Sequence, residues 1–166
     1  TKKLKSKNYD TNKLKEVDWV VGCTMLINLK KILYNPIFDE SFFLFFEETD
    51  LCKRIKDNNG KVYNSSLLVV NHLGHKGSLA ADPKNKIISE KLRNWHYMWS
   101  SFYYHKKHYG YIYSLNKNLG KLIRSIVKMF YFKLKRERVK FTIYKFRFLG
   151  LVNSIMGKKS WYRIEE

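Results

Sequence analysis

The chain has 166 residues, 45% of them apolar and 16% aromatic, which suits one domain with a sizeable core and argues against intrinsic disorder. Its formal net charge of +19 is concentrated in residues 91–166, where 18 Lys/Arg face 3 Asp/Glu. This asymmetry indicates a polyanionic partner, either nucleic acid or an anionic membrane surface. The two cysteines suggest no disulfide framework, and no apolar run approaches the roughly 18 residues of a spanning helix.

The first part of the chain predicts two strands. Residues 1–16 are lysine-rich and aperiodic, which is typical of a linker or a frayed end. Residues 17–27, VDWVVGCTMLI, are β-branched and apolar on both faces, as in a buried strand. Residues 61–72, KVYNSSLLVVNH, predict a second strand.

Helices are expected around these strands and dominate the rest of the chain. NLKKILY (28–34) is long enough only for a short helix, whereas EETDLCKRIKDN (47–58) has an amphipathic pattern that Gly60 can end. A long aromatic helix is expected over 86–108. Two basic amphipathic helices follow, near 116–135 and 138–157. In the first of them one apolar face is formed by Leu119, Leu122, Ile123, Ile126, Val127 and Phe130.

Three acids, Glu47, Glu48 and Asp50, open the helix predicted over 47–58. Acids in a first helical turn are stabilising, by about 0.3–1 kcal/mol each, so helix capping can account for them. Alternatively, one carboxylate is a general base. Partial desolvation by the aromatic run FFLFF (42–46) and like-charged neighbours would raise its pKa for that role. The spacing of the acids does not decide between the two interpretations.

The order of the surrounding motifs favours the second interpretation. W-V-V-G-x-x-M-L-I is followed by F-D-E-x-F-F-L-F-F-E-E-T-D-L-C-K-R-I, K-V-Y, V-V-N-H-x-G-x-x-G-S and, later, Y-Y-H-K-K-H-Y-G. In this order the motifs closely resemble the C-terminal half of inverting family 2 glycosyltransferases of the GT-A fold, particularly the rhamnosyltransferase-like bacterial branch. The resemblance covers about residues 17–110.

The resemblance implies an α/β fold: a partial mixed sheet with flanking helices, followed by a basic α-helical tail. It divides the chain into a linker or a remnant of an upstream half (1–16), the acceptor-side half of the transferase domain (17–110) and a basic amphipathic helical tail (111–166). The donor-binding half and its Asp-x-Asp motif are expected upstream. We therefore expect these 166 residues to be inactive alone.

The resemblance also implies roles for the acids. The family motif usually reads E-D-x-D-L, and its second acid is generally taken as the base that deprotonates the acceptor hydroxyl. That role falls on Glu48, with Glu47 beside it and Asp50 as a supporting or acceptor-binding residue. This sequence has glutamate where aspartate is commoner, so Glu47 remains an alternative base.

Trp19 and Gly22 are core strand residues in the simplest interpretation. In the resemblance they border the acceptor site, where glycine lets a sugar approach the backbone and tryptophan stacks on it. Similarly, Lys106, Lys107 and His108 are either a solvated helix C-terminus or a binding site for the donor diphosphate or a lipid phosphate.

The resemblance implies a divalent cofactor, Mg²⁺ or Mn²⁺, whose Asp-x-Asp ligands are expected upstream. A histidine at the end of the second strand can help to bind that metal or the diphosphate, and we favour His72 over His75 for this role. A zinc site built from Cys23, Cys52, His72 and His75 is possible by ligand type, although nothing in the spacing supports it.

The expected partners are a nucleotide-sugar donor, a glycan or lipid-linked acceptor and an anionic membrane surface. They imply a role in cell-surface polysaccharide synthesis and a cytoplasmic, peripheral location on the inner face of the membrane. Alternating apolar and cationic positions over 116–157 fit either helices on an anionic bilayer or core-facing helices. The rival class is a basic module that binds nucleic acid or a membrane without catalysis. No RNP, KH or zinc-finger signature is present, so no specific nucleic acid is expected.

Overall fold

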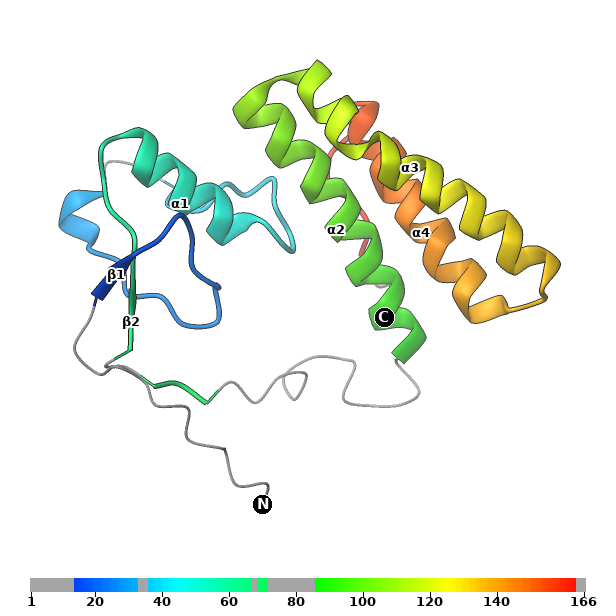
Figure 1. Ribbon diagram of the computed structural model, residues 1–166, viewed down its shortest axis with the longest axis horizontal. Helices are drawn as coiled ribbons and strands as arrows, with labels where there is room; N and C mark the ends of the chain where they lie inside the picture. The colour runs from blue at the N-terminus through cyan, green and yellow to red at the C-terminus, as the bar shows by residue number, and fades with distance from the viewer. Residues whose placement is uncertain (1–13, 33–35, 67–68, 72–85, 164–166) are drawn as a thin grey trace. The chain divides into compact units, whose positions relative to one another are not determined.

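The computed structural model describes residues 14–32, 36–66, 69–71 and 86–163 (Figure 1). The chain forms two compact units. We call Thr1–Phe38 with Glu48–His72 the N-terminal unit, and Asp39–Glu47 with Leu73–Glu166 the helical unit. The described residues combine helices with a small sheet, so an α/β class in the broad sense holds, with helices predominating.

The sheet of the N-terminal unit has two strands. β1 (Leu14–Glu16) pairs antiparallel with β2 (Tyr63–Ser65), with Leu14 opposite Ser65. One further backbone hydrogen bond, 3.0 Å from the Val17 nitrogen to the Val62 oxygen, continues this pairing. In the described ranges this is the one sheet, so the parallel pairs of a mixed sheet are not found there.

The strand predicted over 17–27 is wrong, because residues 17–28 form neither helix nor strand. The second predicted strand is shortened to β2. A strand needs a hydrogen-bonding neighbour, and within the described residues the three-residue β1 is the neighbour that β2 has. The short helix predicted over 28–34 is a 3₁₀ turn, η1 (Leu29–Lys31).

The helix predicted over 47–58 is confirmed as α1 (Glu47–Asp57). Leu51 and Cys52 are buried on one of its sides. The helix ends where Asn59 takes a positive φ of 59° and the Gly60 nitrogen donates to the Ile55 carbonyl, 2.8 Å away. Gly60 suits this stop because a Cβ there would lie 2.6 Å from the Ile55 side chain.

Three helices form the helical unit: α2 (Lys86–Tyr109), α3 (Tyr111–Leu134) and α4 (Arg138–Ile155). Figure 1 shows them packed side by side. Their existence is confirmed, although α3 begins five residues before the predicted start. Met98, Phe102 and Leu151 are fully buried at the centre of this unit.

The apolar face predicted for α3 is only partly buried, with Leu122 packed against the core of the helical unit. Leu119, Ile123, Val127 and Phe130 are each more than half exposed, whereas Ser114, Asn118 and Ser125 are buried. These small polar side chains can be buried because they are hydrogen-bonded. The Ser101 hydroxyl of α2 donates to Asn118 at 3.0 Å, and the Lys121 ammonium donates to the Ser101 hydroxyl at 2.6 Å.

Candidate functional site

Residues 18–22 run along one side of α1 within the N-terminal unit. Asp18 pairs with Lys56, the Val20 backbone N–H hydrogen-bonds the Cys52 sulfur, and Gly22 lies against Glu48. Moving two residues along the segment therefore corresponds to moving four residues along α1, and the segment and the helix run in opposite directions. Two extended residues span about 6.6 Å and four helical residues about 6 Å, so the two spacings nearly match.

The contact between Gly22 and Glu48 joins two residues that the sequence predicted for one site. A Cβ on Gly22 would lie 3.3 Å from the Glu48 Cβ and 3.7 Å from its carboxyl carbon. The missing side chain therefore lets the backbone lie directly along the glutamate. Glu48 itself is half-buried. The site thus holds a carboxylate beside an exposed stretch of backbone.

Trp19 and Val21 alternate with the residues that meet α1, and their side chains are 51% and 59% exposed. The interpretation of Trp19 as a core strand residue is therefore wrong. Segment 18–22 meets α1 through the Asp18 carboxylate, the Val20 backbone and Gly22, and it leaves the Trp19 and Val21 side chains toward solvent. An exposed indole is available to a ligand near Gly22.

Cys52 is a neighbour of Glu48 that the sequence argument did not place in the site. Burial raises the pKa of its thiol, the Val20 N–H hydrogen bond lowers it, and the Glu48 charge raises it again; the net direction is upward. The four-residue spacing of Glu48 and Cys52 on one helix was the signal that could have identified it.

Asp50 is fully buried, and its Oδ2 accepts a hydrogen bond of 2.8 Å from the Arg54 Nε one turn later. Arg54 also donates to the Ile37 carbonyl. The carboxylate thus anchors α1 to the preceding chain. This environment suits the supporting role predicted for Asp50 better than direct contact with an acceptor. Glu47 is the first residue of α1 and is half-buried.

The aromatic run before α1 packs within the helical unit. Phe42 meets Tyr103 edge-on at 5.0 Å between ring centroids, and the Leu44 carbonyl accepts from the Ser100 hydroxyl at 2.8 Å. Phe45 and Phe46 have φ values of 67° and 72°, a left-handed conformation that bulky side chains rarely adopt. Such strain persists only where surrounding contacts impose it, and it is common beside functional sites.

The three residues predicted to bind phosphate have different surroundings. The Lys107 ammonium lies 2.7 Å from the Asp39 carboxylate. Burial would raise the pKa of Asp39, but the hydrogen bonds from Lys107 and Ser41 outweigh it and bring it to about 2. The His108 ring packs on Tyr104 at 4.8 Å. Lys106 lines a cavity in the helical unit.

The predicted metal ligand His72 and its alternative His75 lie outside the described residues. Of the other proposed zinc ligands, Cys23 is exposed and Cys52 is buried. Within the described ranges no group of three or more His, Cys, Asp or Glu side chains could hold a metal ion.

None of the helices in the described part of the chain is both long enough and apolar enough to cross a membrane. Comparisons of the whole sequence with protein-family models, with curated proteins and with solved structures find no match.

Proposed function

We propose that residues 17–110 are the acceptor-side half of an inverting glycosyltransferase of the GT-A fold, similar to family 2. Its donor would be a nucleotide sugar and its acceptor a glycan or a lipid-linked sugar in cell-surface polysaccharide synthesis. The observation that carries the proposal is the contact of Gly22 with Glu48: a Cβ placed on Gly22 would lie 3.3 Å from the Glu48 Cβ. It brings the expected base and the expected acceptor-side glycine together across 25 intervening residues.

In the proposed reaction an acceptor hydroxyl attacks the anomeric carbon of the donor in line with the departing diphosphate. The new glycosidic C–O bond forms as the bond from carbon to phosphate oxygen breaks, with inversion and no covalent enzyme intermediate. Glu48 takes the hydroxyl proton as general base, and the nucleoside diphosphate leaves with the bonding electron pair. A divalent cation would stabilise that leaving group. The described residues offer no ligand group for it, so no step is assigned to the metal.

Trp19 and Gly22 would position the acceptor. An exposed indole presents an apolar face on which the C–H face of a sugar ring can stack. Gly22 leaves room for the sugar beside the backbone and the Glu48 carboxylate. Proximity of this kind is a large part of catalysis when two substrates must meet.

The test is a sugar-transfer assay on protein that also contains the proposed upstream donor half, with a panel of nucleotide sugars. Glu48→Gln should abolish transfer and leave donor binding nearly unchanged. Asp57→Asn, at the exposed end of the same helix, is the matched control and should retain activity. Retained turnover in Glu48→Gln, with loss in Glu47→Gln, would move the base to Glu47. Turnover in both variants would overturn the proposal.

A second candidate function, attachment to an anionic membrane surface, rests on α3. Along this helix runs an exposed row that we call the α3 apolar stripe: Leu119, Ile123, Val127, Phe130 and Leu134. Every member is more than half exposed, and the three- and four-residue spacing places them on one face. Lys117, Arg124 and Lys128 form a second row along the same helix. Apolar side chains beside cations match the boundary between acyl chains and anionic head groups.

The same surface disfavours nucleic acid as the partner. Phosphate contacts would use the cations alone and would leave the α3 apolar stripe in water. Vesicle sedimentation separates the two. Ile123→Ser with Val127→Ser should reduce binding to phosphatidylglycerol vesicles at least tenfold, and Lys145→Gln on α4 should have little effect. Vesicle binding that survives the double substitution would contradict membrane attachment. Selective binding of one nucleic-acid sequence would support the rival class.

A further inference from the structure

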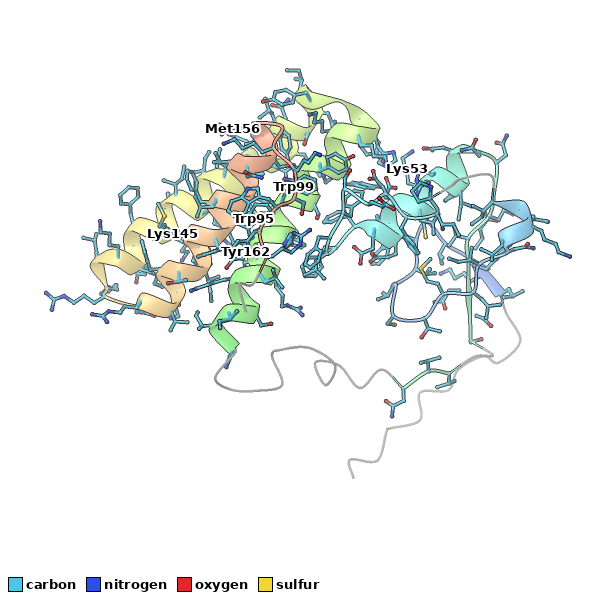
Figure 2. The ribbon with its side chains drawn as sticks, turned by 180° about the vertical axis from the view of Figure 1, so that it is seen from behind. Lys53, Trp95, Trp99, Lys145, Met156 and Tyr162 are labelled. Atoms are coloured by element: carbon cyan, nitrogen blue, oxygen red, sulfur yellow. The ribbon has the colours of Figure 1, made fainter. Side chains whose placement is uncertain are left out.

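The cavity that Lys106 lines lies inside the helical unit and has a volume of about 350 Å³. It is bounded by Glu40 and Ser41, by α2, by the end of α4 and by the segment that follows α4. That segment runs back along α2 near Trp99 (Figure 2). The Trp99 indole donates to the Lys158 carbonyl at 3.0 Å, and the Ser160 hydroxyl hydrogen-bonds the His96 ring at 3.0 Å. These bonds fix the wall of the cavity.

Cations dominate the lining. Three lysines, Lys106, Lys158 and Lys159, are among the lining residues, against one acid, Glu40. Lys158 and Lys159 follow Gly157, whose φ of 71° turns the chain after the end of α4. Three lysines around a small cavity form a site for an anion with several oxygen atoms, which a compact ammonium group binds as a point charge.

A buried hydroxyl provides independent support. Ser154 lines the cavity and is 3% exposed, yet its Oγ has no hydrogen-bond partner within the described structure. Buried polar atoms are nearly always hydrogen-bonded, and leaving one unsatisfied is destabilising. A bound oxyanion would accept the hydrogen bond that this hydroxyl lacks.

We infer that this cavity, which we call the lysine cavity, binds a phosphoryl or diphosphoryl group. Lys106, Lys158 and Lys159 neutralise its charge, and the Ser154 hydroxyl donates to one of its oxygen atoms. Glu40 is exposed and leaves one acceptor for a hydroxyl on the organic part of the ligand. Lys106 alone was predicted to bind phosphate from the resemblance; the cavity and its other residues come from the structure, and they share no residue with the Glu48 site, so the inference does not depend on the proposed transfer reaction.

Calorimetric titration with inorganic pyrophosphate at low salt tests the inference. Lys158→Gln with Lys159→Gln should weaken binding at least tenfold. The matched control removes two charges elsewhere, as Lys117→Gln with Lys145→Gln, and should weaken binding by less than about threefold. Lys145 lies on α4, is exposed and does not line the cavity (Figure 2). Equal losses in the two double variants would mean attraction by bulk charge and would overturn the inference.

Ser154→Ala tests whether the Ser154 hydroxyl binds the ligand or only supports the fold. It should weaken pyrophosphate binding several-fold and leave the thermal midpoint of the free protein unchanged or higher, because an unsatisfied hydroxyl is removed. A lower midpoint with unchanged affinity would contradict the role of Ser154. Uridine diphosphate in solution and farnesyl phosphate in phosphatidylcholine vesicles then identify the source of the phosphoryl group. The source is the one whose binding is lost in the Lys158/Lys159 variant. Because the readout is binding alone, failure of sugar transfer leaves this result intact.

Discussion

A Cβ atom placed on Gly150 of α4 would lie 2.2 Å from the carbonyl oxygen of Trp95 on α2. The carbonyl carbon and Cα of Trp95 would be 2.9 and 3.0 Å away, so only glycine permits this approach of the two helices. The neighbouring Leu151 is fully buried in the same interface. At Gly150 the backbones of α4 and α2 are therefore in direct contact.

Gly150→Ala should therefore destabilise the protein by about 1–3 kcal/mol or more, because backbone rather than a flexible side chain would have to move. Gly120 of α3 is the matched control, since nothing lies within 4 Å of a Cβ placed there. Gly120→Ala should raise stability by up to about 1 kcal/mol through helix propensity. Urea denaturation measures both values. Equal stability of the two variants would contradict the close approach.

His96 should make stability depend on pH in a window set by its folded pKa. Burial lowers that pKa from 6.5 to about 4; the hydrogen bond to the Tyr162 carbonyl opposes the change and the Arg163 charge adds to it. The Nε2–H donates to Tyr162 at 2.8 Å, and Nδ1 accepts from the Ser160 hydroxyl. The ring is therefore neutral in the folded protein.

Between pH 6.5 and about 4 the unfolded chain binds a proton that folded His96 does not. Its contribution to stability is present above pH 6.5 and is lost as the pH falls to about 4, by about 3 kcal/mol at most. Urea denaturation at several pH values should show this slope in the native protein and a shallower one in His96→Gln. Asp39 titrates lower, since its pKa falls from 3.8 to about 2, and its contribution is lost only below pH 3.8. Identical slopes in the two proteins would refute the assignment.

The helices were predictable because their signals are local. The apolar spacing and the stop at Gly60 place α1 within one residue of its predicted bounds, and α2 and α4 agree nearly as well. How far the apolar face of α3 is buried was not predictable from polarity. Ser114 and Asn118 would be assigned to solvent by composition, and their burial depends on hydrogen bonds to α2.

The remaining wrong predictions and the candidate site both depend on contacts between residues that are far apart in the sequence. The apolar run over 17–27 has strand character, but residues 18–22 lie along α1 and pair with no strand. No spacing rule joins Gly22 to Glu48, and only the order of motifs placed them in one site. Lys158 and Lys159 were missed because a Gly-Lys-Lys-Ser sequence after a helix is too common to indicate a cavity, and Ser154 was missed because a single serine within a helix gives no signal.

Asp50 and Arg54 should contribute to folding. Asp50→Asn removes the charge from a fully buried carboxylate whose partner, Arg54, stays in place. Breaking a buried ion pair at one side costs about 3–5 kcal/mol. Asp57→Asn breaks an exposed pair with Lys53 on the same helix and should cost less than about 1 kcal/mol. Thermal denaturation compares the two, and similar midpoints would show that Asp50 has no anchoring role.

Cys52 offers a direct measure of the Glu48 environment. Cys23 is exposed, so alkylation at neutral pH should modify it first. Cys52 should react slowly, because it is buried and its pKa is raised. The Glu48 charge is one cause of that rise, so Glu48→Gln should lower the Cys52 pKa and shift its alkylation profile to lower pH. Cys23 serves as the internal control.

The direction of this change separates electrostatics from loosening of the fold. If Glu48→Gln merely opened the segment over α1, Cys52 would react faster at every pH and its profile would keep its midpoint. If the midpoint of the Cys52 alkylation profile falls while Cys52 stays as slow to react at low pH as in the native protein, the Glu48 carboxylate lies within electrostatic reach of the thiol. The same carboxylate would then face the Gly22 backbone, where the proposed acceptor hydroxyl must lie. An unchanged Cys52 midpoint would remove Glu48 from this position and with it the basis for its role as the base.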